Sequence, residues 1–134
     1  MPATLGPGDP PRLRVLVVDD NRDSADTLAL LLGMLGHEVS RCYDPHQVEA
    51  LANEMRPDLV LLDLGMPGLS GYDVARQLRM SASGAALRLV AMTGWGQPED
   101  FRRTREAGFD AHLVKPVDAE ALVGLIATWG QHND

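Results

Sequence analysis

The sequence has little that would place it outside a reducing compartment or inside a membrane. Its 134 residues include one cysteine, Cys42, so no disulfide can form within the chain, which suits the cytoplasm. No apolar run approaches the roughly 18 residues that a membrane-spanning helix needs. The first residues also lack the basic and then apolar order of a signal peptide. We therefore predict a cytoplasmic domain that makes no contact with a membrane.

Positive charge is also scarce. The chain has 12 Lys and Arg residues against 19 Asp and Glu residues, a formal net charge of −7. Nucleic-acid-binding domains usually carry a basic stripe, so the sequence predicts no direct contact with nucleic acid. Lysine itself occurs only once, at Lys115. A chain that otherwise uses arginine thus keeps one compact ammonium group at this position.

What the sequence does contain is an alternation of strand and helix patterns. Residues 1–11 hold four prolines and two glycines, which predicts a disordered tail or linker. One domain is expected over residues 12–130, followed by a C-terminal tail at residues 131–134. Short apolar segments predict buried parallel strands at residues 14–18, 38–42, 59–62, 87–92 and 111–114. Helical spacing predicts five helices, at residues 24–35, 45–55, 72–80, 98–107 and 119–129.

Polar residues stand where four of these strands end. Asp19 and Asp20 follow the first strand, and Asp63 follows the third. Thr93 follows the fourth strand and Lys115 the fifth. In an open parallel sheet, functional groups gather at the carboxyl ends of the strands. We therefore expect three carboxylates, a hydroxyl and an ammonium group to converge at one edge.

This set of side chains suits phosphoryl transfer that depends on Mg²⁺. Three carboxylates repel one another and one ammonium group compensates only part of their charge, so a divalent cation with oxygen ligands is expected. With the cation and Lys115 on the phosphoryl oxygens, one carboxylate can act as nucleophile and form an acyl phosphate. Thr93 can donate its hydroxyl to a phosphoryl oxygen. Positioning and charge stabilisation are most of what this chemistry requires.

The chain resembles the receiver domain of two-component response regulators, from about Arg12 to Gly130. The matching segments are VVDDN at 17–21, LLDLGMP at 61–67, GY at 71–72, AMTG at 91–94 and LVKP at 113–116. Each segment is a weak signal alone, but all of them in this order are a strong one. The resemblance implies a doubly wound, flavodoxin-like α/β fold with five parallel strands in the order 2-1-3-4-5 and five helices.

The same resemblance implies roles for single residues. Asp63 would be the phosphoacceptor, and Asp20, Asp63 and the Gly65 carbonyl would bind Mg²⁺ directly. Asp19 would act mainly through water. Lys115 would pair with the phosphoryl group, and its peptide bond to the following proline is expected to be cis.

Thr93 would follow the phosphoryl group as part of a switch whose second member is His112. The family usually has Tyr or Phe three residues before the lysine, whereas this chain has histidine. Because histidine titrates near neutrality, we expect its coupling to Thr93 to differ from the usual pattern.

A histidine kinase or a histidine phosphotransfer protein is the expected partner. On the first helix, Leu30 and Met34 fall together on the outside, and exposed apolar patches often mark partner surfaces. Alternatively, Leu30 and Met34 lie at the flanks of the buried face of this helix, where neighbouring residues partly cover them. Trp95 lies in a polar loop and is expected at the mouth of the site. The sequence leaves the oligomeric state open, a monomer included.

The leading hypothesis is a phosphorylation-dependent signalling switch, which catalyses only its own phosphorylation and dephosphorylation. It would stand alone or form the receiver segment of a hybrid histidine kinase, acting as a phosphorelay intermediate. A Mg²⁺-dependent aspartyl-phosphate phosphatase usually needs a general-acid carboxylate two residues after the nucleophile, where Gly65 stands. A degenerate receiver is disfavoured because no site residue is missing. A flavin-binding domain is disfavoured because Asp19 and Asp20 would repel a phosphate.

Overall fold

The computed structural model describes residues 12–66, 70–81, 87–94 and 98–131. The strands are β1 Arg14–Val18, β2 Glu38–Cys42, β3 Leu59–Asp63, β4 Arg88–Thr93 and β5 Ala111–Val114. The α-helices are α1 Arg22–Met34, α2 Val48–Met55, α3 Gly71–Met80, α4 Pro98–Ala107 and α5 Ala119–Gln131. All strand pairs are parallel and the order is β2-β1-β3-β4-β5, which confirms the predicted fold.

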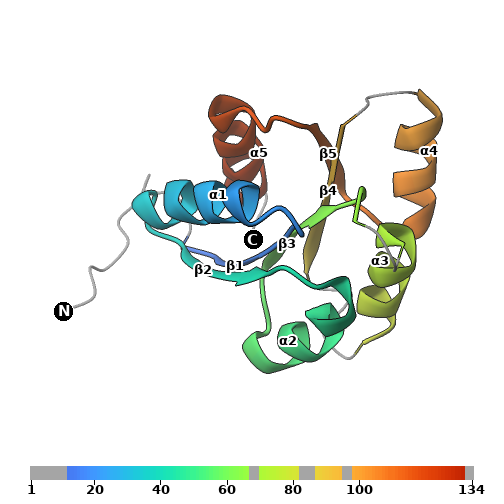
Figure 1. The fold of residues 1–134 in the computed structure, drawn as a ribbon. Coiled ribbons are helices and arrows are strands. Elements are labelled where there is room, and N and C mark those ends of the chain that lie inside the picture. Colours follow the sequence, from blue (N-terminus) through green and yellow to red (C-terminus); the bar gives the residue numbers. More distant parts are fainter. Residues whose placement is uncertain (1–11, 67–69, 82–86, 95–97, 132–134) are drawn as a thin grey trace.

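Helices cover both faces of the sheet, with α1 and α5 on one side and α2 and α3 on the other (Figure 1). Neighbouring residues of a strand point to opposite faces. In β1, Val15 and Val17 therefore pack with α1 and α5, whereas Leu16 and Val18 pack with α2 and α3. Because both faces are covered, the central strands are apolar between their ends instead of alternating with polar residues.

Local caps set where several helices begin. The side chain of Asn21 accepts a hydrogen bond from the Ser24 N–H, so α1 begins at Arg22, two residues before the predicted start. The predicted second helix opens as a short 3₁₀ turn, Pro45–Gln47, before α2 begins. Helix α5 continues to Gln131, two residues beyond its predicted end.

Some predictions concern residues that are not described. The predicted tail at residues 1–11 lies outside the described residues, and so do residues 132–134. Among the helices in the described part of the chain, none has the length and apolar character needed to cross a membrane.

Candidate functional site

Three carboxylates meet at the carboxyl end of the sheet. Asp19 and Asp20 follow β1, and Asp63 ends β3, which is the neighbour of β1 in the sheet. One oxygen from each carboxylate lies within 4.8 Å of the others. Asp19 is 0% and Asp63 5% exposed, whereas Asp20 is exposed. The sheet therefore brings together the three carboxylates that the sequence analysis selected.

The only lysine of the chain reaches this cluster from the end of β5. Lys115 Nζ donates a hydrogen bond to Asp19 Oδ2 at 2.9 Å and lies 3.5 Å from Asp63 Oδ2. Partial burial acts to lower the pKa of Lys115, but its hydrogen bond to Asp19 and the charges of Asp63 and Asp19 outweigh burial and raise the pKa. Lys115 therefore remains a cation next to both buried carboxylates.

Backbone N–H groups hold the other oxygen of each buried carboxylate. The Asn21 N–H donates to Asp19 Oδ1 at 3.0 Å, and the Gly65 N–H donates to Asp63 Oδ1 at 2.9 Å. These bonds fix the orientation of both carboxylates, so that their second oxygens face Lys115. Both contacts form within two residues of the carboxylate, because the chain turns directly after each strand.

The cluster brings three carboxylates together with one ammonium group. Burial raises the pKa of Asp63, and the neighbouring Asp19 raises it further. The Gly65 N–H and the Lys115 ammonium act in the opposite direction, but they do not cancel the rise. An oxygen-rich cluster with this imbalance fits a hard divalent cation. The residues present could therefore hold a metal ion.

A side chain has little room at Gly71, where α3 begins. A Cβ atom at Gly71 would lie 2.6 Å from Leu64 Cδ2 and 3.2 Å from the Leu64 Cα. A Cβ atom at this position would therefore require the Leu64 side chain, next to Asp63, to shift. This close packing favours glycine at position 71.

Thr93 and His112, the two predicted switch residues, are in direct contact. Thr93 ends β4 and is 7% exposed, and its Oγ1 lies 2.8 Å from His112 Nε2 on β5. The other ring nitrogen, His112 Nδ1, lies 3.4 Å from the hydroxyl of Thr104 on α4. The sequence analysis missed Thr104, because a single threonine in a helix rich in charged residues gives no signal of its own.

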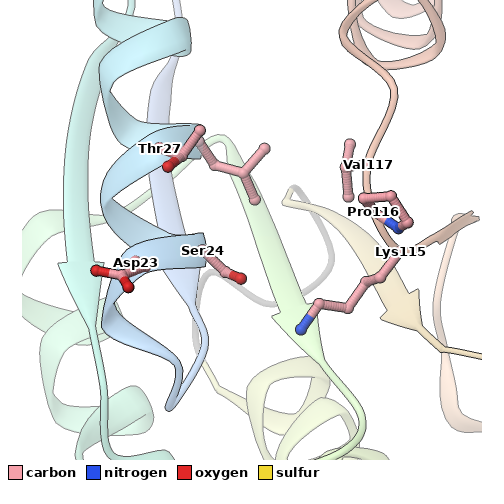
Figure 2. Close-up of a pocket in the computed structure, with 7 residues that line it drawn as sticks. Asp23, Ser24, Thr27, Lys115, Pro116 and Val117 are labelled. Atoms are coloured by element: carbon pink, nitrogen blue, oxygen red, sulfur yellow. The ribbon is translucent and has the colours of Figure 1, made fainter.

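A pocket of about 260 Å³ opens beside Lys115, between the first turns of α1 and the segment after β5. Figure 2 shows Ser24 and Lys115 pointing into this space. The pocket is lined by Asp23, Ser24, Thr27, Leu28, Lys115, Pro116 and Val117. The peptide bond between Lys115 and Pro116 is cis, as predicted.

The two apolar residues predicted on the outside of the first helix are exposed. Leu30 is 66% and Met34 77% exposed on the C-terminal half of α1. Their role as a partner surface stays a prediction. Trp95, predicted at the mouth of the site, lies outside the described residues.

Comparisons with known proteins agree on one family. Residues 15–127 match the profile of the response regulator receiver domain. The chain is 35% identical over 113 residues to Protein PilH of Pseudomonas aeruginosa, which covers 84% of this chain and 93% of that protein. Among solved structures, the chemotaxis protein CheY4 of Vibrio cholerae matches with a TM-score of 0.82 and 26% identity, covering 87% of this chain and 97% of that one.

Other relatives are longer. The chain is 32% identical over 121 residues to the DNA-binding dual master transcriptional regulator RpaA of Synechocystis, covering 90% of this chain and 50% of that protein. It is 36% identical over 126 residues to the DNA-binding response regulator MtrA of Mycobacterium tuberculosis, covering 94% of this chain and 54% of that protein. The chain thus spans about half the length of these two curated relatives. It belongs to the response regulator receiver domain family of two-component signalling.

Proposed function

We propose that this receiver domain is a phosphorylation-dependent switch that accepts a phosphoryl group on Asp63 in a Mg²⁺-dependent reaction. The observation that carries the proposal is the environment of Asp63. This carboxylate is 5% exposed, lies 3.5 Å from the only lysine, and shares a cluster with two other carboxylates. Such a site offers a nucleophile together with the positive charge that a phosphoryl group requires.

The hydrogen bonds favour Asp63 over Asp19 as the nucleophile. Asp19 uses Oδ1 to accept from a backbone N–H and Oδ2 to accept from Lys115 at 2.9 Å. In Asp63, Oδ1 accepts from the Gly65 N–H, whereas Oδ2 has a longer contact of 3.5 Å with Lys115. The raised pKa of Asp63 also makes its oxygens more basic. Asp63 Oδ2 would attack phosphorus while the bond from phosphorus to the donor breaks, and the donor would leave with the bonding electrons.

We assign the metal site to the same cluster. Asp20, Asp63 and the Gly65 carbonyl would bind Mg²⁺ directly, and Asp19 would act through water. When bound, the ion neutralises charge on the carboxylates and on the phosphoryl oxygens. The direct ion pair between Asp19 and Lys115 supports the indirect role for Asp19, since this carboxylate already has a cation.

Lys115 and Thr93 would recognise the transferred group. The ammonium of Lys115 donates to one phosphoryl oxygen, and the Thr93 hydroxyl donates to another. Because Thr93 contacts His112 at 2.8 Å, a change at Thr93 reaches β5 directly. Thr93 and His112 would therefore form the switch that reports phosphorylation.

A histidine kinase or a histidine phosphotransfer protein would be the phosphoryl donor, and the reaction would take place in the cytoplasm. The donor must approach the edge where Lys115 and Ser24 border the pocket in Figure 2. Leu30 and Met34 lie further along the same helix, on its C-terminal half, and would form the apolar part of the docking surface. The same surface would serve a stand-alone receiver and the receiver segment of a hybrid kinase.

Incubation with acetyl phosphate and Mg²⁺, followed by intact-mass measurement, tests the proposal. We expect one added phosphoryl group on the wild type, and none on Asp63→Asn or after removal of the metal with a chelator. Asp58→Asn is a matched control, because Asp58 precedes the opposite end of β3 and accepts from the Arg14 N–H. It should be labelled like the wild type. A wild type that takes no phosphoryl group from acetyl phosphate or from a phosphohistidine donor would refute the proposed function.

A further inference from the structure

A second group of polar side chains joins α1 to the end of β2, outside the carboxylate cluster. Tyr43 directly follows β2, and its hydroxyl donates to Asp26 Oδ1 at 2.6 Å. Arg41 Nη1 donates to the same oxygen at 3.2 Å. The guanidinium carbon of Arg22 lies over the Tyr43 ring, 4.3 Å from its centroid. Tyr43 therefore contacts one anion and one cation of α1, the first through its hydroxyl and the second through its ring.

This group stands next to the proposed metal ligands. Strand β2 ends at Cys42, whose carbonyl accepts from the Asp19 N–H at 3.0 Å. Tyr43 is the following residue, so it is level with the start of the acidic pair. Arg22 comes two residues after Asp20, so their Cα atoms lie at most about 7 Å apart. An arginine side chain can span that distance, and the Asp20 carboxylate is exposed.

The described part of the chain nevertheless contains no ion pair made by Arg22. Asp26, four residues further along α1, is a usual type of partner for a helical arginine. Its Oδ1 already accepts from both Tyr43 and Arg41. The face of the Tyr43 ring is the contact that Arg22 makes instead, and an aromatic face attracts a guanidinium. The ring is itself held in place, because it packs against the apolar cluster beneath α1.

We propose that Tyr43 is a positioning residue, which keeps Arg22 on the face of its ring and away from the Asp20 carboxylate. Asp20 would then stay available to Mg²⁺. The inference rests on the proposed function, because it requires Asp20 to bind the ion directly. It goes further by giving roles to Tyr43 and Arg22, two residues that belong neither to the metal ligands nor to the groups that would recognise the phosphoryl group.

The charge of Arg22 would oppose the ion if its guanidinium reached Asp20. A carboxylate oxygen that accepts from a guanidinium is less available to Mg²⁺, and the two cations repel each other. Lys115 already supplies one cation on the side of Asp19 and Asp63. A second cation at Asp20 would occupy the carboxylate that is left for the ion. Because this part of the cluster is exposed to solvent, we expect a moderate loss of Mg²⁺ affinity, about threefold to tenfold.

Titration calorimetry of the metal-free protein with a magnesium salt tests the inference. Low ionic strength is needed, because salt screens exposed charges. Tyr43→Leu removes the aromatic face and should weaken Mg²⁺ binding about threefold to tenfold. Arg22→Gln alone should bind within about twofold of the wild type, and the same substitution should restore the affinity of Tyr43→Leu. Tyr43→Phe keeps the ring and should bind like the wild type, although it loses the hydroxyl.

Three results of the titrations would overturn the inference. The first is a Tyr43→Leu protein with the affinity of the wild type. The second is an equal loss with and without Arg22→Gln, which would show that Tyr43 supports the fold and does not act through Arg22. The third is a gain of more than about threefold in Arg22→Gln alone, because Arg22 would then oppose the ion even while it lies on the ring.

A measurement on the wild type tests the inference even if Tyr43→Leu does not fold. Protons above the face of an aromatic ring resonate upfield of their ordinary position, and the ¹H NMR signals lost in Arg22→Gln identify those of Arg22. The Arg22 δ-methylene protons should be shifted upfield both without and with Mg²⁺. Ordinary positions in the metal-free protein would overturn the inference. A wild type that shows the upfield shifts but binds no Mg²⁺ would instead refute the proposed metal site.

Discussion

Replacing Asp63 with asparagine should make the metal-free protein more stable, although it removes the proposed phosphoacceptor. Burial is the main cause that raises the pKa of Asp63, and the neighbouring Asp19 raises it further. The ionised carboxylate is therefore disfavoured in the folded state. Asparagine has nearly the same shape and carries no charge. Its side-chain oxygen can still accept the Gly65 N–H. The substitution therefore removes an unfavourable charge and keeps the local hydrogen bond.

The size of the effect follows from the geometry of the cluster. At an effective dielectric constant of about 20, a carboxylate at the 4.8 Å limit repels Asp63 by about 3.5 kcal/mol, and Lys115 at 3.5 Å attracts it by about 4.7 kcal/mol. Asp19 and Asp20 both repel, but Asp20 is exposed and therefore screened. The interactions between charges nearly balance, so the cost of burying the ionised carboxylate decides the sign. We expect Asp63→Asn to gain about 1 to 2 kcal/mol at neutral pH.

The gain should depend on pH. A raised pKa means that the wild-type protein has its full stability below the ordinary value of 3.8 and loses part of it as the pH rises through the folded-state pKa. The difference between the variant and the wild type should therefore be largest near neutral pH and vanish below 3.8. Excess Mg²⁺ should also reduce the difference in stability between Asp63→Asn and the wild type, because the ion binds the wild type more strongly and so stabilises it more.

Urea denaturation with an excess of chelator measures this difference as a shift in midpoint at constant m-value. Asp110→Asn is a control of opposite sign, because Asp110 Oδ2 accepts from Arg79 at 2.6 Å and from the Leu89 N–H at 2.8 Å. That variant should lose about 1 kcal/mol. An Asp63→Asn protein that is less stable than the wild type at neutral pH without metal would show that burying the ionised carboxylate has no net cost.

Three other variants test the roles of Lys115, of Asp20 and of the exposed apolar side chains on α1. Lys115→Arg should lower the rate of phosphorylation at least about tenfold, because the planar guanidinium directs its donors differently from an ammonium group; labelling at the wild-type rate would show that only charge matters. Asp20→Asn should weaken Mg²⁺ binding about tenfold or more, measured by titration calorimetry, and unchanged affinity would remove Asp20 from the metal site. Replacing Leu30 and Met34 together by Glu should slow transfer from the phosphohistidine partner but spare labelling by acetyl phosphate. Equal losses with both donors would indicate damage to the fold instead.

The sequence predicted the sheet well, for a physical reason. Strands covered on both faces must be apolar throughout, so segments such as Leu59–Leu62 are visible in the sequence. The polar residues at the ends of four of the five strands then mark the functional edge, and Asp19, Asp63 and Lys115 do meet there. The α4 boundaries, Pro98–Ala107, also agree with the prediction, because proline and glycine limit that segment in the sequence.

Other features did not follow from the spacing of apolar residues. Helix α1 begins two residues early because Asn21 caps it by accepting the Ser24 N–H, a local contact that the helical spacing alone does not predict. The remaining features depend on contacts between distant parts of the chain. The shorter contact of Lys115 is with Asp19 at 2.9 Å, not with Asp63, and only the positions of the atoms decide this. Thr104 meets His112 because α4 packs beside β5, and no spacing in the sequence records that contact.

Locating the phosphoryl group is the most direct test of the central claim that Asp63 is the phosphoacceptor. Borohydride reduces an acyl phosphate to an alcohol, so it converts a phosphorylated aspartate into homoserine and releases phosphate. Peptide mass spectrometry after labelling with acetyl phosphate and Mg²⁺, then reduction, should find homoserine at position 63 and at no other aspartate. Homoserine at position 19 or 20, or a labelled protein in which no aspartate is converted, would contradict the claim.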